Sequence, residues 1–141
     1  MDMERITGIA DTGFIVALVD RQDPHHQAVK NVYLQQQKII VPQSVLAEVA
    51  YLLGCHAGIS SVVQFLRSLQ ESRFQLMALS EADISRAADI LEHYQGSRVD
   101  FVDASVMAMA EKLNLTIILT LDRRDFSLYR PQHCSAFTLL P

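Results

Sequence analysis

The stretch VDFVDASVMAMAE, residues 99–111, decides how this chain of 141 residues is interpreted. Its pattern predicts a helix that is apolar on nearly every side, and such a helix is expected to be covered on more than one face. Asp100 and Asp103 lie at its start, where a separation of three residues places both carboxylates on one face of the first turn. Acids at a helix N-terminus have one simple explanation, because they stabilise the helix dipole by about 0.3–1 kcal/mol. The other explanation is that further acids converge on the same place.

Length and composition limit the class of protein. The chain suits a single domain over residues 1–141, and with half its residues apolar and a fifth charged it is typical of soluble globular proteins. No run approaches the roughly 20 apolar residues of a membrane span, and no signal peptide is recognisable, so we expect a cytoplasmic protein without membrane contact. Cys55 and Cys134 show no metal or disulfide spacing and are expected to be small buried apolar residues.

The net charge of −4 argues against a protein that coats nucleic acid through a basic stripe. It permits a nucleic-acid enzyme whose own acids hold a metal.

Short apolar strands alternate with helices along the chain. This order predicts a parallel sheet with helices on both faces. The expected strands are residues 5–11, 38–41, 74–79, 116–121 and 136–140; the expected helices are 14–19, 25–37, 45–55, about 60–69, 80–94 and 99–111, with a turn or short helix at 123–126. The expected inward faces are Ala28, Val32 and Tyr33 in the second helix and Ile84, Ala87, Ala88 and Leu91 in the fifth.

In open parallel sheets, ligands bind at the carboxyl ends of the strands. Asp11 ends the first expected strand and Asp122 ends the fourth. Asp100 and Asp103 begin the helix that leads into the fourth strand, so they lie at the same edge. Glu48 lies one turn into another helix that starts there. We therefore expect four or five acids to meet at one end of the sheet.

Converging carboxylates have a characteristic chemistry. They raise one another's pKa values unless a cation lies between them. Hard oxygen ligands without cysteine or histidine favour Mg²⁺ or Mn²⁺, ions that activate a water molecule and stabilise the leaving oxygen of a phosphodiester. Thr12 and Thr120 neighbour two of the expected ligands. Their hydroxyls either orient carboxylates or the attacking water, or belong to an ordinary turn and strand.

Each acid also has a structural explanation. Asp11 and Asp122 can cap the segments that follow them, and Glu48 can pair with an arginine. Asp125 is either a supporting member of the site or a solvated turn acid. Taken together, these explanations require independent coincidences at one edge of the sheet.

Other catalytic classes lack their signatures. The chain has neither a Walker loop nor a G-x-G-x-x-G motif, so the usual backbone cradle for nucleotide phosphates is missing. Gly13 occupies the place of the second acid of a phosphoryl-aspartate enzyme, and no nucleophile elbow surrounds any serine.

Four segments in order carry a resemblance to a known family. They are DTG at 11–13, LAEVAYLL at 46–53, DASVMAMAE at 103–111 and TLDRRDF at 120–126. The chain resembles a PIN domain from Ile9 to about Phe137, and in particular the VapC-type toxins of bacterial toxin–antitoxin systems. The resemblance implies a three-layer α/β/α fold around a parallel, roughly five-stranded sheet.

The resemblance also implies an activity and a site. Members of the family are Mg²⁺- or Mn²⁺-dependent ribonucleases that cleave single-stranded or loop RNA. They often form homodimers, and the toxins among them are silenced by a small antitoxin protein. The implied catalytic and metal-binding residues are Asp11, Glu48, Asp103 and Asp122, with Asp100 as an additional metal ligand.

An acidic chain must attract RNA through local basic patches. Arg123 and Arg124 beside Asp122 are the expected RNA-binding residues; Arg130, Arg21 and Lys30 are further candidates, and solvated surface charge is the alternative for all of them. The alternative function is a non-catalytic PIN-like binding or interaction module, or an RNA-processing factor.

Overall fold

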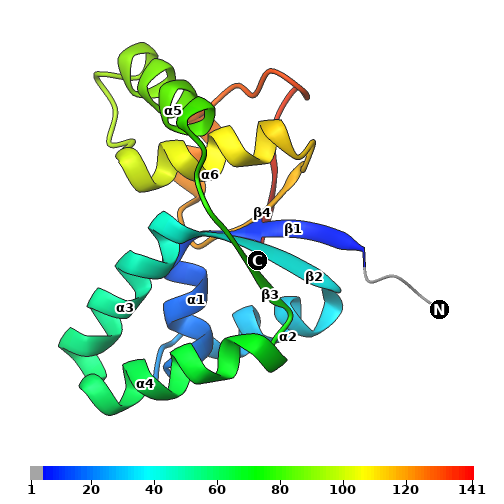
Figure 1. The fold of residues 1–141 in the computed structure, drawn as a ribbon. Helices are drawn as coiled ribbons and strands as arrows, with labels where there is room; N and C mark the ends of the chain where they lie inside the picture. Colours follow the sequence, from blue (N-terminus) through cyan, green and yellow to red (C-terminus); the bar gives the residue numbers. More distant parts are fainter. Residues whose placement is uncertain (1–4) are drawn as a thin grey trace.

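The computed structural model describes residues 5–141, which form one parallel sheet with helices on its two faces (Figure 1). The strand order is β3-β2-β1-β4-β5, and every neighbouring pair is parallel. The chain leaves the central strand β1 on one side for β2 and β3, and returns on its other side for β4 and β5. The carboxyl ends of β1 and β4 therefore flank the switch point where ligands bind in such sheets. The strands are β1 (Ile6–Ala10), β2 (Lys38–Pro42), β3 (Phe74–Met77), β4 (Ile117–Leu119) and β5 (Thr138–Leu140).

The helices form the two outer layers. In Figure 1, α1 to α4 lie below the sheet, and α6 and then α5 lie above it. This arrangement confirms the predicted α/β/α architecture with a five-stranded parallel sheet. The helices are α1 (Thr12–Val19), α2 (His26–Gln35), α3 (Gln43–Ala57), α4 (Ile59–Ser68), α5 (Glu81–His93), α6 (Phe101–Lys112) and the short α7 (Arg123–Leu128), with a 3₁₀ turn η1 (Leu69–Glu71) after α4.

Helix α6 has the environment that its sequence predicts. Every residue from 104 to 110 is buried, because α5 covers one side of the helix and the sheet covers another (Figure 1). The start of α3 also meets α6, where the Ser44 and Ser105 hydroxyl oxygens are 2.6 Å apart. Ser105 donates its own proton to the carbonyl oxygen of Val102, so Ser44 is the donor across this contact. Ser44 thus joins two helices and does not cap α3, which begins at Gln43.

The predicted inward face of α5 is partly wrong. Ala87 is buried as expected, but Ile84 is 48% exposed and Ala88 is exposed, while Asp83 and Ile90 turn inward. The buried Asp83 carboxylate accepts hydrogen bonds from the Ser80 amide at 2.8 Å and from Lys112 Nζ at 3.2 Å. These two donors satisfy the hydrogen-bonding capacity of the Asp83 carboxylate. The helix can therefore bury a different face from the one that apolar spacing alone predicts.

Two further expectations on burial are wrong for local reasons. In α2, Val29 and Val32 face the core, whereas Ala28 is exposed. Cys55 is exposed because it lies in the last turn of α3, off the face that buries Val45, Val49 and Leu53. Gly58 ends this helix, with a φ of +87° that an L side chain rarely adopts.

Across residues 5–141, the helices are all too short or too polar to cross a membrane.

Candidate metal centre

Asp11 is the buried centre of the acidic edge. It follows β1 directly, and its amide donates to the carbonyl oxygen of Leu119 at 2.9 Å, which extends the β1–β4 pairing. Asp11 occupies the N-cap position of α1 as the capping explanation expects, but its carboxylate makes no side-chain capping hydrogen bond there. Instead, Thr120 Oγ1 donates to Asp11 Oδ2 at 3.1 Å and itself accepts from the Asp122 amide at 2.9 Å. Thr120 therefore orients the carboxylate of one strand end and the backbone of the next.

The environment of Asp11 disfavours its charge. The residue is 6% exposed. Burial is the main reason that the pKa of Asp11 rises to about 6, and the charges of Asp122 and Glu48 raise it further against the lowering effect of the Thr12 amide and the Thr120 hydroxyl. Glu48, on the second turn of α3, is therefore within electrostatic reach of Asp11.

Asp103 combines a structural role with a free oxygen. Asp100 Oδ1 accepts from the Asp103 amide at 2.9 Å, and Asp103 Oδ2 accepts from the Asp100 amide at 3.1 Å, which makes a reciprocal capping box at the start of α6. This confirms the helix-start explanation for both residues, yet it uses only one oxygen of each. Burial, followed by the charges of Asp11 and Asp100, raises the pKa of Asp103 to about 8.

The fourth strand end contributes two more carboxylates. Asp122 caps α7, where its Oδ1 accepts from the Asp125 amide at 3.1 Å. Asp125 is 6% exposed and not the solvated turn acid of the alternative interpretation. One oxygen each from Asp103, Asp122 and Asp125 lie within 4.8 Å of one another. Burial and the neighbouring Asp122 raise the pKa of Asp125, whereas Arg124 and Arg98 act to lower it.

The structure separates the six predicted acids into three sets. Asp103, Asp122 and Asp125 share one small space; Asp11 lies within electrostatic reach of Asp103 and Asp122, and Glu48 lies within reach of Asp11. Asp100 is exposed and lies outside the three-oxygen group, with its Oδ1 used in the capping box. A direct metal contact by Asp100 stays a prediction.

The donor set fits a hard divalent cation. The three close side chains all offer carboxylate oxygens, and within residues 5–141 no lysine or arginine forms an ion pair with them, with Asp11 or with Glu48. Thr12 Oγ1 is buried without a hydrogen-bond partner in the same part of the chain, so it is available to a water molecule or phosphate oxygen. A divalent ion relieves the repulsion that raises these pKa values, and oxygen-only ligands suit Mg²⁺ or Mn²⁺.

The predicted RNA-binding arginines have different surroundings. The Arg123 guanidinium donates to the carbonyl oxygen of Leu139 at 3.4 Å and to that of Pro141, so it ties α7 to the end of β5. Arg124 is exposed, and its guanidinium makes no hydrogen bond within residues 5–141. Arg130 donates to the Ser127 carbonyl oxygen at 2.6 Å, at the C-terminal end of α7. Arg21 and Lys30 line a cavity formed with α2 and α4, apart from the acids.

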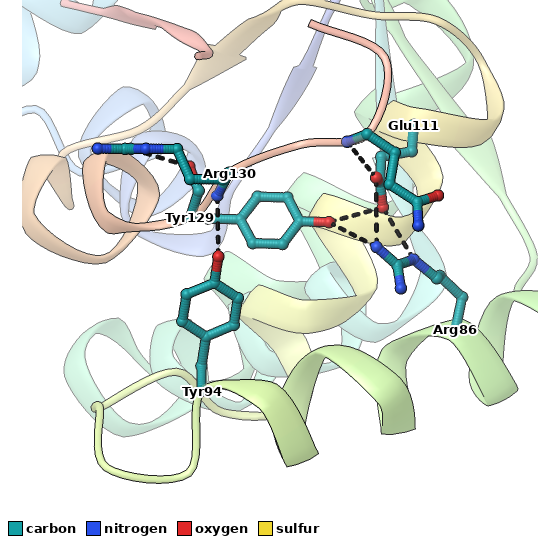
Figure 2. A network of polar contacts seen from close by, with 6 residues as sticks. Arg86, Tyr94, Glu111, Tyr129 and Arg130 are labelled. Atoms are coloured by element: carbon teal, nitrogen blue, oxygen red, sulfur yellow. Dashed lines mark hydrogen bonds and ion pairs between the residues drawn. The ribbon is translucent and has the colours of Figure 1, made fainter. Parts of the chain in front are cut away.

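A polar network anchors the far end of α7. Figure 2 shows the Tyr129 hydroxyl between Glu111 and Arg86, donating to Glu111 Oε1 at 2.6 Å. Arg86 Nε donates to the same oxygen at 3.1 Å, and the Gln132 amide donates to Oε2 at 2.7 Å. Burial alone would raise the pKa of Glu111, but the bonds from Arg86 and Tyr129 outweigh it and hold this pKa below its usual value. The network fixes the chain just after the helix that carries Asp125.

We expect Tyr129→Phe to lower the free energy of unfolding by about 1–3 kcal/mol, because the buried Glu111 loses a short hydrogen bond. Urea unfolding followed by circular dichroism measures the change. Tyr51→Phe is the matched control, since Tyr51 is 70% exposed and its hydroxyl removal should change stability by less than about 0.5 kcal/mol. Equal stability of the two variants would contradict the role given to the network.

Two residues at this site were not predicted correctly from the sequence: Asp125 was expected only as a supporting or solvated acid, and Arg98 was not expected there at all. Asp125 repeats after Asp122 the spacing of three that links Asp100 and Asp103, and this repeat was the available signal. Arg98 has no such signal, because only the folded turn between α5 and α6 brings it near Asp125.

Comparisons with known proteins place this fold and sequence in a family. Residues 9–130 match the PIN domain family. The chain is 34% identical to Ribonuclease VapC26 of Mycobacterium tuberculosis over 134 residues, which cover 94% of this chain and 99% of that protein. The fold is similar to the crystal structure of VapC20 of Mycobacterium tuberculosis, described as a sarcin-ricin loop cleaving toxin, with a TM-score of 0.77, 21% identity and coverage of 84% of this chain and 92% of the other.

A further solved structure has the same fold within an assembly. It is a toxin–antitoxin complex from Klebsiella pneumoniae, with a TM-score of 0.66, 15% identity and coverage of 86% of this chain and 92% of the other. The family match spans most of the chain, and the 34% identical relative is covered almost from end to end. This chain belongs to the PIN domain family and is similar, within it, to the VapC-type ribonucleases.

Proposed function

We propose that this chain is a metal-dependent endoribonuclease that hydrolyses single-stranded or loop RNA and serves as the toxin of a toxin–antitoxin pair. The observation that carries the proposal is the group of converging, partly to fully buried acids at the switch point of the sheet, in a chain that is 34% identical to a ribonuclease. Because the substrate is RNA, the proposal places the protein in the cytoplasm.

In this proposal the acids have two different roles. Asp103, Asp122 and Asp125 hold Mg²⁺ or Mn²⁺ through their close oxygens, and Asp11 and Glu48 complete the negative pocket around it. Such an ion supplies positive charge to the phosphodiester oxygens and increases the acidity of a water molecule. Thr120 fixes the orientation of the Asp11 carboxylate, and the unpartnered Thr12 hydroxyl is a donor for a phosphate oxygen. The buried body of α6 keeps Asp103 in place against the sheet.

The proposal includes two protein partners. A small antitoxin is supported by the toxin–antitoxin assemblies among the similar folds. A homodimer is supported by the exposed apolar side chains Ile59, Val63 and Leu66, which all lie on α4. Sedimentation analysis of the purified chain tests the second partner directly, and a monomer at all concentrations would remove it from the proposal.

Expression in a bacterial host tests the ribonuclease. We expect the wild type to slow growth and to produce new RNA ends in total RNA, and Asp103→Asn to do neither. Asp89→Asn is the matched control, because it makes the same chemical change at an exposed acid on α5. Identical RNA from cells that express the wild type and Asp103→Asn would overturn the proposal and favour a non-catalytic binding module.

A further inference from the structure

A cavity of about 570 Å³ opens next to the metal centre, between α7 and the turn that precedes α6. Asp125 belongs both to the wall of this cavity and to the three-carboxylate group, so the two spaces are neighbours. Arg98 and Arg124 line the cavity from the two segments, and Tyr94 and Leu128 add apolar surface. The cavity therefore combines two cations, an apolar wall and access to the acids.

The two guanidinium groups are available to a ligand. Arg98 and Arg124 are exposed, and among residues 5–141 neither guanidinium has a hydrogen bond or an ion pair that holds it. Arg123 and Arg130 differ, because their guanidinium groups donate hydrogen bonds to backbone carbonyl oxygens. Position in the chain alone does not distinguish these four arginines; the structure does.

We propose that Arg98 and Arg124 bind a backbone phosphate of the RNA next to the one that is cleaved, while its nucleotide lies against Tyr94 and Leu128. This inference rests on the proposed function. Guanidinium groups bind phosphate oxygens in pairs of parallel hydrogen bonds, which gives both charge and geometry. This chain needs such a positive site to bind RNA, because its net charge of −4 and its acidic pocket repel RNA elsewhere.

A phosphodiester chain suits the cavity better than an acidic protein segment does. The Asp125 carboxylate in the cavity wall repels a phosphate and an acidic side chain alike, so the regular spacing of phosphates along RNA, and not charge alone, decides between the two ligands. RNA instead continues from the arginines to the metal centre, where its next phosphate meets a divalent ion. A single RNA strand therefore fits both the cavity and the neighbouring metal centre.

Salt-dependent RNA binding tests the proposal. The parent is Asp103→Asn, which binds without cleaving, and the probe is a fluorescein-labelled single-stranded RNA of mixed sequence followed by anisotropy in Mg²⁺. We expect Arg98→Gln and Arg124→Gln each to weaken binding roughly tenfold and to reduce the slope of log affinity against log salt by about 0.7. Arg67→Gln, which removes an exposed charge on α4, should leave the slope unchanged.

The outcomes separate this proposal from the ribonuclease itself. An unchanged salt slope in both arginine variants, or a parent that does not bind the RNA, would overturn the phosphate site. Cleavage of total RNA by the wild type is measured alongside and reports on the ribonuclease alone. A labelled oligoaspartate that binds the parent and loses affinity in the arginine variants, while RNA binding stays unchanged, would reassign the cavity to an acidic protein partner.

Discussion

Asp103→Asn is expected to reduce the rate of RNA cleavage by the purified protein about 1000-fold or more. The substitution removes a negative ligand from the close group of three carboxylates, and the loss of one preorganised electrostatic contact already costs about 10²–10³ in rate. The asparagine carbonyl can still accept the Asp100 amide, so the capping box at the start of α6 persists. The rate is measured on labelled RNA under single-turnover conditions.

The controls for this loss separate chemistry from folding. The circular dichroism spectrum of Asp103→Asn should match that of the wild type, and its unfolding should remain a single cooperative transition, at a stability no lower than that of the wild type because the substitution also removes a partly buried charge. Asp89→Asn should cleave at the wild-type rate, since Asp89 lies on the exposed side of α5. A wild-type cleavage rate in Asp103→Asn would show that this acid is not part of the catalytic site.

Asp11→Asn is expected to stabilise the metal-free protein at neutral and alkaline pH, by about 2–3 kcal/mol. Burial raises the pKa of Asp11 to about 6, so the folded state holds this proton more tightly than the unfolded state does. Stability is therefore lost as the pH rises from the unfolded pKa, near 4, through the folded pKa, and stays low above it. Asparagine has no charge to bury and escapes this loss, while Thr120 can still donate to its carbonyl oxygen.

Denaturant unfolding in EDTA across this pH range measures the effect. The difference between Asp11→Asn and the wild type should be largest above about pH 7 and should disappear near pH 4. Adding Mn²⁺ at neutral pH should stabilise the wild type by mass action and the variant much less. A difference in stability that is the same at every pH would contradict the buried charge as its cause.

The sequence predicted where the site lies better than it predicted which residues form it. The rule for parallel sheets brought Asp11, Asp103 and Asp122 to one edge because strand order and direction determine where their side chains begin. Asp125 was harder to place, since α7 has only six residues and shows no helical periodicity. Its burial depends on how α7 packs, which is a tertiary property.

Buried polar pairs explain the errors in helix orientation. In α5, apolar spacing predicted that Ile84 faces the core, but Asp83 takes an inward position because Ser80 and Lys112 satisfy it. Arg98 was missed for a related reason: its relation to Asp125 exists only after the turn before α6 has packed beside α7. Patterns of apolar residues carry no information on either contact.

Cleavage of labelled RNA by the purified wild type, in EDTA and after addition of Mg²⁺ or Mn²⁺, tests most directly whether the acids at the sheet edge form a metal-dependent nuclease. The account predicts no cleavage in EDTA, cleavage after either ion is restored in excess, and no such recovery in Asp103→Asn. Cleavage that continues unchanged in EDTA, or that returns equally in Asp103→Asn, would contradict it.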